Sequence, residues 1–198
     1  MTAYDQPAGN VLLNASRMEN DLILLKDKAL SEETTLINGA QYTIVTYADK
    51  KLYYNAAGIL EMAEVTKPVV EDALPQALEA YKKAFSVDPK GTKSKEIAQG
   101  LNSIGEKYVN EAYNAFSVGN LKGARDLFQK AVDAVANKPL EKTDTSSIYN
   151  TALVSHMLGD YAAAKPIFER CLEIGYLSDN GEVYSKLADC VAHLDTTA

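Results

Sequence analysis

The chain has 198 residues, of which 46% are hydrophobic and 24% charged, a balance typical of a globular protein with a buried core. Its net charge of -7 at pH 7 disfavours nucleic acid as a partner, because phosphate binding depends on Lys and Arg. No apolar run reaches the roughly 18 residues that a membrane-spanning helix needs. The start of the sequence lacks the basic and apolar segments of an export signal. We therefore expect neither a transmembrane segment nor a signal peptide.

Hydrophobic residues recur at helical spacing along nearly the whole chain, so we expect about eight helices and no sheet. In chain order, the predicted helices cover about 10–30, 38–64, 76–87, 94–118, 121–135, 146–158, 161–174 and 181–194. The helix over 38–64 is predicted from Tyr42, Val45, Leu52, Ala56, Ile59, Leu60 and Ala63. Pro75 suits the first turn of a helix, Gly119 suits a helix end, and Asn120 can cap the helix that follows.

Two segments of the chain repeat each other. GNLKGARDLFQKA is followed, forty residues later, by GDYAAAKPIFERC, which aligns Ala124 with Ala164 and Phe128 with Phe168. Small residues at these places let two antiparallel helices approach closely, and the aromatic residue fills the space between them. We therefore interpret the matched residues as packing positions.

This spacing resembles the tetratricopeptide repeat (TPR), a family of two-helix repeats. The family's pattern of large, small, glycine, and Ala–aromatic–Ala residues reads Tyr108, Ala112, Gly119, Ala124, Phe128, Ala131 in one unit and Ile148, Ala152, Gly159, Ala164, Phe168, Cys171 in the next. A further unit is half legible in QALEAYKKAFSVDP, with EVTKPVVEDA inserted between its helices. The spacing of forty is longer than the family's usual thirty-four, and Pro166 inside a helix is expected to bend its axis.

The resemblance implies an all-α fold, a right-handed superhelix of helical hairpins forming a single domain over 1–198. Its predicted parts are an N-terminal helix over 10–37, an irregular first repeat over 38–90, a second repeat over 93–137, a third over 145–177 and a capping or truncated-repeat helix over 181–195.

In function, the resemblance implies a non-catalytic scaffold that binds a peptide or partner helix of another protein along a concave groove. The alternative is self-assembly, or a structural subunit of a larger cell-envelope complex, and the oligomeric state stays open. The similarity to TPR proteins of bacterial cell envelopes implies the periplasm or envelope as location, with the cytoplasm as the alternative. The groove candidates, on the first helices of the repeats, are Tyr53, Ala57, Asn110, Tyr113, Phe116, Tyr149, Asn150, Leu153, His156 and Met157.

Some of these positions carry specific expectations. Asn110 and Asn150 recur at the same place, either to hydrogen-bond a peptide backbone or as solvated or capping residues. TPR domains that grip a C-terminal carboxylate have Lys and Arg here, where this chain has Tyr and Asn, so such a ligand is not expected. Tyr113 and Tyr149 are predicted partner contacts. Three further tyrosines are predicted to pack in the core, namely Tyr108, Tyr161 and Tyr184.

We expect no catalysis, no cofactor and no metal, because no P-loop, GxGxxG or GxSxG motif is present. His156 and His193, the latter four residues after Asp189, are conceivable ligands of a shared metal, but solvated surface histidines are the simpler interpretation. Cys171 and Cys190 are interpreted as free buried thiols, with a disulfide between adjacent helices as the alternative.

Overall fold

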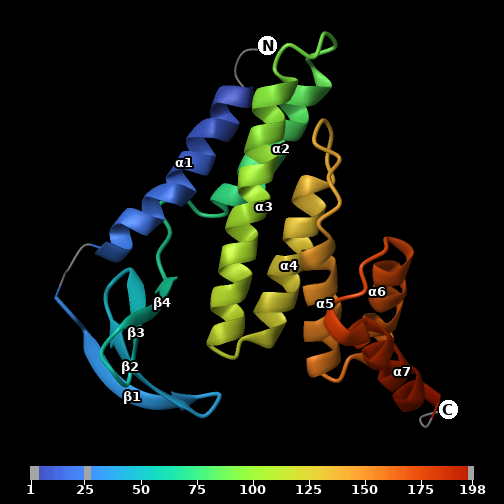
Figure 1. The fold of residues 1–198 in the computed structure, drawn as a ribbon. Helices are drawn as coiled ribbons and strands as arrows, with labels where there is room; N and C mark the ends of the chain where they lie inside the picture. The colour runs from blue at the N-terminus through green and yellow to red at the C-terminus, as the bar shows by residue number, and fades with distance from the viewer. Residues whose placement is uncertain (1–4, 25–27, 196–198) are drawn as a thin grey trace. The chain divides into compact units, whose positions relative to one another are not determined.

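The computed structural model describes residues 5–24 and 28–195 (Figure 1). The chain divides into two compact units. Unit 1 comprises Met1–Ile104, Ser117–Gly119 and Lys138–Leu140, and unit 2 comprises Gly105–Phe116, Asn120–Asn137 and Glu141–Ala198. Helix α3 (Ser94–Ser117) contributes residues to both units.

Unit 1 contains a four-stranded antiparallel sheet, visible in Figure 1, that the sequence interpretation did not expect. Its strands are β1 (Ser31–Ile37), β2 (Ala40–Thr46), β3 (Lys50–Asn55) and β4 (Leu60–Val65), in the spatial order β1-β2-β3-β4. The prediction of an all-α superhelix is therefore wrong, and the fold is mixed α/β. The predicted helix over 38–64 is wrong, because this segment forms β2, β3 and β4. The end of the predicted N-terminal helix, over 31–37, is wrong as well, because it forms β1. Residues 25–27 of that helix lie outside the described residues.

Local chemistry explains the sheet. Asn38 and Gly39 both have positive φ angles, of 51° and 83°, and Ile37 pairs with Ala40 across them. This is the two-residue turn that Asn-Gly favours in β-hairpins. The segments that follow are rich in β-branched and aromatic residues, which pack well on a pleated surface. Spacing by three and four residues therefore misled the helical interpretation, because Tyr42, Ile44 and Thr46 also alternate at the period of a strand.

The sheet has its own small core. Ile44, Tyr53 and Met62 lie opposite one another on β2, β3 and β4, and all three are buried. Ile37, Tyr42 and Val118 pack around them. Two helices complete the described part of unit 1 together with the first part of α3: α1 (Asp5–Leu24) and α2 (Ala73–Ser86), which pack against each other.

Unit 2 is helical, and its helices lie close to the predicted ranges. Besides the part of α3 over Gly105–Phe116, they are α4 (Leu121–Val135), α5 (Thr145–Met157), α6 (Tyr161–Glu173) and α7 (Glu182–Asp195), with a short 3-10 turn, η1 (Asp179–Gly181), before α7. From α4 to α7, consecutive helices pack against each other, in the pairs α4–α5, α5–α6 and α6–α7. The repeated residues of the sequence motif, Ala124, Ala164, Phe128 and Phe168, are all fully buried or nearly so, which confirms that they are packing positions.

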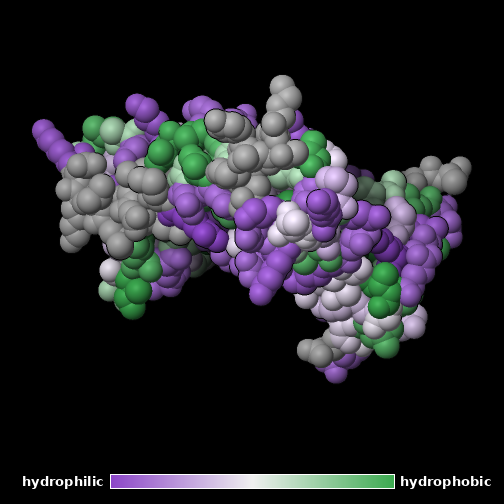
Figure 2. Space-filling view, turned by 90° about the horizontal axis from the view of Figure 1, so that it is seen from above, coloured by the Kyte–Doolittle hydropathy of each residue, from purple (hydrophilic) through white to green (hydrophobic). Residues whose placement is uncertain are grey.

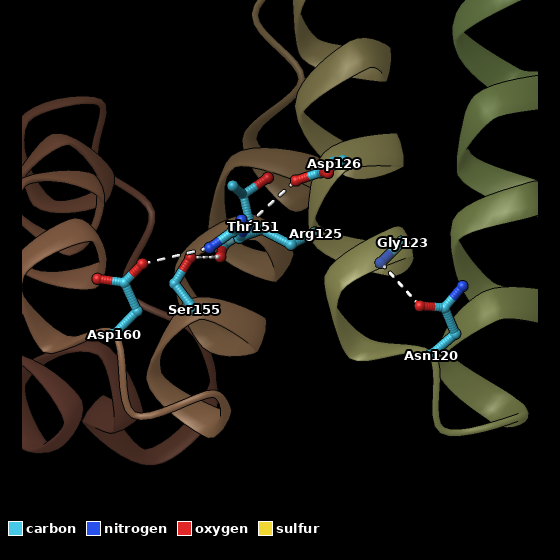
Figure 3. Close-up of polar contacts among 7 residues, drawn as sticks. All are labelled: Asn120, Gly123, Arg125, Asp126, Thr151, Ser155 and Asp160. Carbon is cyan, nitrogen blue, oxygen red and sulfur yellow. Dashed lines mark hydrogen bonds and ion pairs between the residues drawn. The ribbon is translucent and has the colours of Figure 1, made fainter.

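The turns between these helices use matching chemistry. Gly119 and Gly159 have φ angles of 79° and 74°, in the left-handed region that favours glycine. The following Asn120 and Asp160 cap α4 and α6, because their side-chain oxygens accept hydrogen bonds from the backbone N–H of Gly123 and Ala163. Figure 3 shows that Arg125 of α4 reaches Asp160, with Nη1 and Oδ2 3.3 Å apart, and so joins one hairpin to the cap of the next.

Candidate protein-binding surface

On the face drawn in Figure 2, hydrophobic residues form small groups separated by hydrophilic ones. On this face, binding would therefore depend on individual exposed side chains rather than on one large apolar patch.

Tyr113 is the most exposed aromatic residue among the predicted contacts, at 51% exposure. Its ring packs edge-on against buried Phe128, with centroids 5.2 Å apart and planes at 85°. Its hydroxyl accepts a hydrogen bond of 3.0 Å from the Nδ2 of Asn150 on α5. Tyr113 is thus held at both ends of its side chain while half of its surface stays open to solvent.

Tyr113 has exposed neighbours on the same helix. Asn110 and Asn114 are exposed, and with Tyr113 they occupy positions i, i+3 and i+4, which form one stripe on α3. Phe116 instead packs partly buried against the cluster around Ala112. Tyr113 is therefore the aromatic residue of this exposed stripe, beside two asparagines.

The predicted contacts on α5 divide into exposed and buried ones. Met157 is exposed, and Leu153 is half-buried against the core that contains Phe168. Tyr149 is buried at 7% exposure, with its ring 5.2 Å from that of Tyr176. Burial raises the pKa of Tyr149 above the usual range of a tyrosine. The prediction that Tyr149 contacts a partner is therefore not compatible with its position.

The two predicted contacts from the first part of the chain lie in the hairpin of β3 and β4 and not on a helix. Tyr53 is buried on β3, where its hydroxyl donates a hydrogen bond of 3.0 Å to Glu64. Ala57 is exposed in the turn between β3 and β4, where its N–H donates to the side chain of Asn55. Since the helix predicted to carry them does not exist, neither belongs to a helical groove.

The remaining tyrosine predictions have mixed outcomes. Tyr108 is buried, as predicted, and Tyr161 is half-buried against the core of unit 2. Tyr184 on α7 is 56% exposed, so its interpretation as a core residue is wrong. Tyr184 follows buried Val183 by only one helical position, and it points away from the stripe of α7 that is buried.

His156 belongs to a polar cluster between α5 and α7. Its Nε2 lies 2.5 Å from Oδ2 of Asp189, and its side chain is only 12% exposed, so the interpretation as a solvated histidine is wrong for His156. The His193 ring stacks on Tyr161, with centroids 4.1 Å apart, and its Nδ1 lies 2.9 Å from the Asp189 carbonyl oxygen. The sequence placed His193 one helical turn from Asp189 and brought in His156 only as a conceivable ligand of a shared metal, whereas the structure has His156 in direct contact with Asp189, 33 residues away.

This cluster is held together by hydrogen bonds between histidine nitrogens and oxygens of Asp189. Asp189 thus contacts both histidines, through its carboxylate with His156 Nε2 and through its carbonyl oxygen with His193 Nδ1. In residues 5–24 and 28–195, no group of three or more His, Cys, Asp or Glu is arranged to hold a metal ion. Cys171 and Cys190 are free and buried, and burial raises the pKa of Cys171 to about 11. The cluster joins α5 to α7.

Unit 1 has one further feature that the sequence did not indicate, a polar cavity of about 400 Å³ beside Tyr81. Tyr81 is fully buried, its hydroxyl donates to Oδ1 of Asn10, and its ring lies directly over Gly100. The cavity is lined by Asn10, Leu13, Arg17, Tyr81, Glu96, Gln99, Gly100 and Ser103. Only the tertiary packing of α1, α2 and α3 brings these residues together.

Among the helices that the structure describes, none is long and apolar enough to cross a membrane. No protein-family model matches the chain. No curated protein is significantly similar to it.

Proposed function

We propose that unit 2 binds a peptide or helix of another protein, and that Tyr113 is the anchor of its binding surface. One observation carries the proposal. Tyr113 is half exposed, yet Phe128 and Asn150 fix its ring and hydroxyl. Tyrosines are favoured anchors at protein interfaces because they bury a large area at a small cost in side-chain entropy. A tyrosine already held in the free protein loses still less freedom on binding.

The pair of Tyr113 and Asn150 also offers hydrogen bonds to a peptide backbone. Asn150 uses its Nδ2 to donate to the tyrosine hydroxyl, which leaves its Oδ1 to accept from a peptide N–H. The Tyr113 hydroxyl accepts from Asn150 and retains its own proton to donate to a peptide carbonyl. This pair recognises backbone rather than a charged terminus, consistent with a sequence that lacks Lys and Arg at the corresponding positions.

The resemblance of the segments around Ala124 and Ala164 to TPR units gives independent support, because TPR proteins bind other proteins through the first helices of their repeats. Tyr113 lies on α3 and Asn150 on α5, which are the first helices of the two matched units. A location in the cell envelope is implied by the same resemblance and stays a prediction.

The test begins with selection of peptides from a random phage-displayed library on the purified full chain, followed by calorimetric titration of the selected peptides. We expect Tyr113→Ala to weaken binding at least tenfold, which corresponds to about 1.4 kcal/mol. Tyr113→Phe, which keeps the ring and loses the hydroxyl, should cause a smaller loss. Leu177→Ala is the matched control, because Leu177 is equally exposed, at 49%, but lies outside α3 and α5.

Two results would overturn the proposal. One is a set of selected peptides that bind Tyr113→Ala as tightly as the unaltered chain. The other is self-association through this surface, seen in light scattering as a dimer that Tyr113→Ala dissociates. That result would show that the surface around Tyr113 binds a second copy of this chain and not another protein.

A further inference from the structure

Strand β1 is an edge of the sheet in unit 1. It pairs with β2 on one side, and no strand of the described chain pairs with its other side (Figure 1). Six of its seven residues are exposed. An edge of this kind presents a row of backbone N–H and C=O groups that another extended segment can join.

Proteins usually protect such edges by a short strand, a bulge, a proline, charged side chains (above all lysine) or a covering element. β1 is seven residues long, pairs with β2 without interruption and contains neither Pro nor Lys, so its charged side chains are Glu32 and Glu33. The irregularity in the sheet lies between β3 and β4, next to Tyr53. Leu36 is 70% exposed on β1, which adds an apolar side chain to an open edge.

The charge on β1 identifies the chemistry of a partner. Glu32 and Glu33 are adjacent, so their side chains lie on opposite faces of the sheet. Their partners on β2 are Val45 and Ile44, which carry no charge. Two carboxylates on the open strand oppose pairing with an acidic segment and favour a segment with Lys or Arg beside them.

We propose that β1 binds an extended basic segment of another protein, which adds to the sheet as a fifth strand. The backbone of β1 supplies the affinity, Glu32 and Glu33 select Lys or Arg in the partner, and Leu36 contacts an apolar residue. This recognition mode is β-strand addition, in which backbone hydrogen bonds bind and side chains on alternate faces select. It involves unit 1 alone and does not depend on the surface around Tyr113.

The experiment uses fluorescent seven-residue peptides and anisotropy titration of the full chain. The probe has Lys at the two positions opposite Glu32 and Glu33 and Thr or Val elsewhere, and its counterpart has Glu at those two positions. We expect the Lys peptide to bind at least tenfold more tightly than the Glu peptide. The variant Glu32→Lys/Glu33→Lys should reverse this preference. Glu169→Lys/Glu173→Lys, which makes the same charge change on α6, should leave it unchanged.

Backbone pairing is tested separately from charge. Two versions of the Lys peptide carry N-methyl groups on alternate amides, and only one set of alternate amides can face β1. We expect one of these peptides to lose binding and the other to retain it. Equal behaviour of the two, or equal binding of the Lys and Glu peptides, would overturn the proposal. So would a dimer of the free chain that Glu32→Lys/Glu33→Lys dissociates, because a second copy would then occupy the edge.

Discussion

The sharpest test of the packing in unit 2 is the replacement of Phe168 by alanine. Phe168 is fully buried in a cluster that also contains Ala152 and Ala164. Its ring lies edge-on to Tyr149 and to His156, with centroids 6.2 Å and 6.4 Å away. One side chain therefore joins residues of α5 and α6 in the core of this unit.

The expected loss follows from these surroundings. Truncation of a buried Phe to Ala costs about 3–5 kcal/mol, and the cost is highest where the site cannot collapse. Ala152 and Ala164 have no side-chain length with which to refill the space. The value includes the aromatic contacts, which are worth about 0.5–1.5 kcal/mol for each pair. We therefore expect a loss of about 4 kcal/mol, a large share of the roughly 5–15 kcal/mol that stabilises a typical domain.

The assay is urea unfolding followed by circular dichroism, with Leu177→Ala as the exposed control, which should change the free energy of unfolding by less than about 0.5 kcal/mol. Phe128→Ala removes the matching residue of the other repeated segment, in a separate cluster with Ala112 and Ala124. We expect a similar loss there. A loss below about 1.5 kcal/mol for either phenylalanine would show that the repeated aromatic is not a main packing residue.

Three further predictions concern Gly100, Tyr149 and the buried groups Cys171 and Tyr53. Gly100→Ala would place a Cβ 2.3 Å from the buried Tyr81 ring, so overpacking of about 1–3 kcal/mol should outweigh the gain of about 1 kcal/mol in helix propensity; an unchanged or higher thermal midpoint would contradict this. The Tyr149 hydroxyl is buried and makes no hydrogen bond of good geometry, although the nearby Glu182 side chain helps to raise its pKa, so Tyr149→Phe should leave the urea midpoint unchanged or raise it; a clear decrease would show that Glu182 accepts a stabilising hydrogen bond from this hydroxyl. Burial raises the pKa of Cys171 from 9.0 to about 11, and burial with the Glu64 hydrogen bond raises that of Tyr53 from 10.0 to about 12. The folded state therefore holds both protons more tightly than the unfolded state. Their contribution to the free energy of unfolding is complete below pH 9 and is lost as the pH rises toward 11 and 12. Urea midpoints should fall from pH 8.5 to pH 10.5, less steeply in Cys171→Ala, and a flat profile would refute the linkage.

The helices of unit 2 could be predicted from the sequence because their signals are local. Gly119 and Asn120 end one helix and cap the next through contacts within a few residues, and Gly159 and Asp160 do the same forty residues later. Helical spacing of apolar residues then assigns the buried side of each helix.

The sheet was missed although it too has a local signal. Asn38-Gly39 is a strong hairpin turn, but short apolar runs satisfy the helical and the strand period together. The backbone of each strand gains its hydrogen bonds from the neighbouring strand. The choice therefore depended on pairing such as that of Ile44 with Tyr53, which no single segment reveals.

For the candidate site, the sequence by itself determined which residue types stand on each helix, and only the tertiary structure decided which of them face solvent. Tyr113 and Tyr149 are both predicted partner contacts on the first helices of their repeats, yet Tyr113 is half exposed while Tyr149 lies buried against Tyr176 from the loop after α6. His156 and Asp189 meet only because α5 packs against α7. Helix periodicity is set within a few residues of the chain, whereas exposure is set by whichever distant segment covers each face.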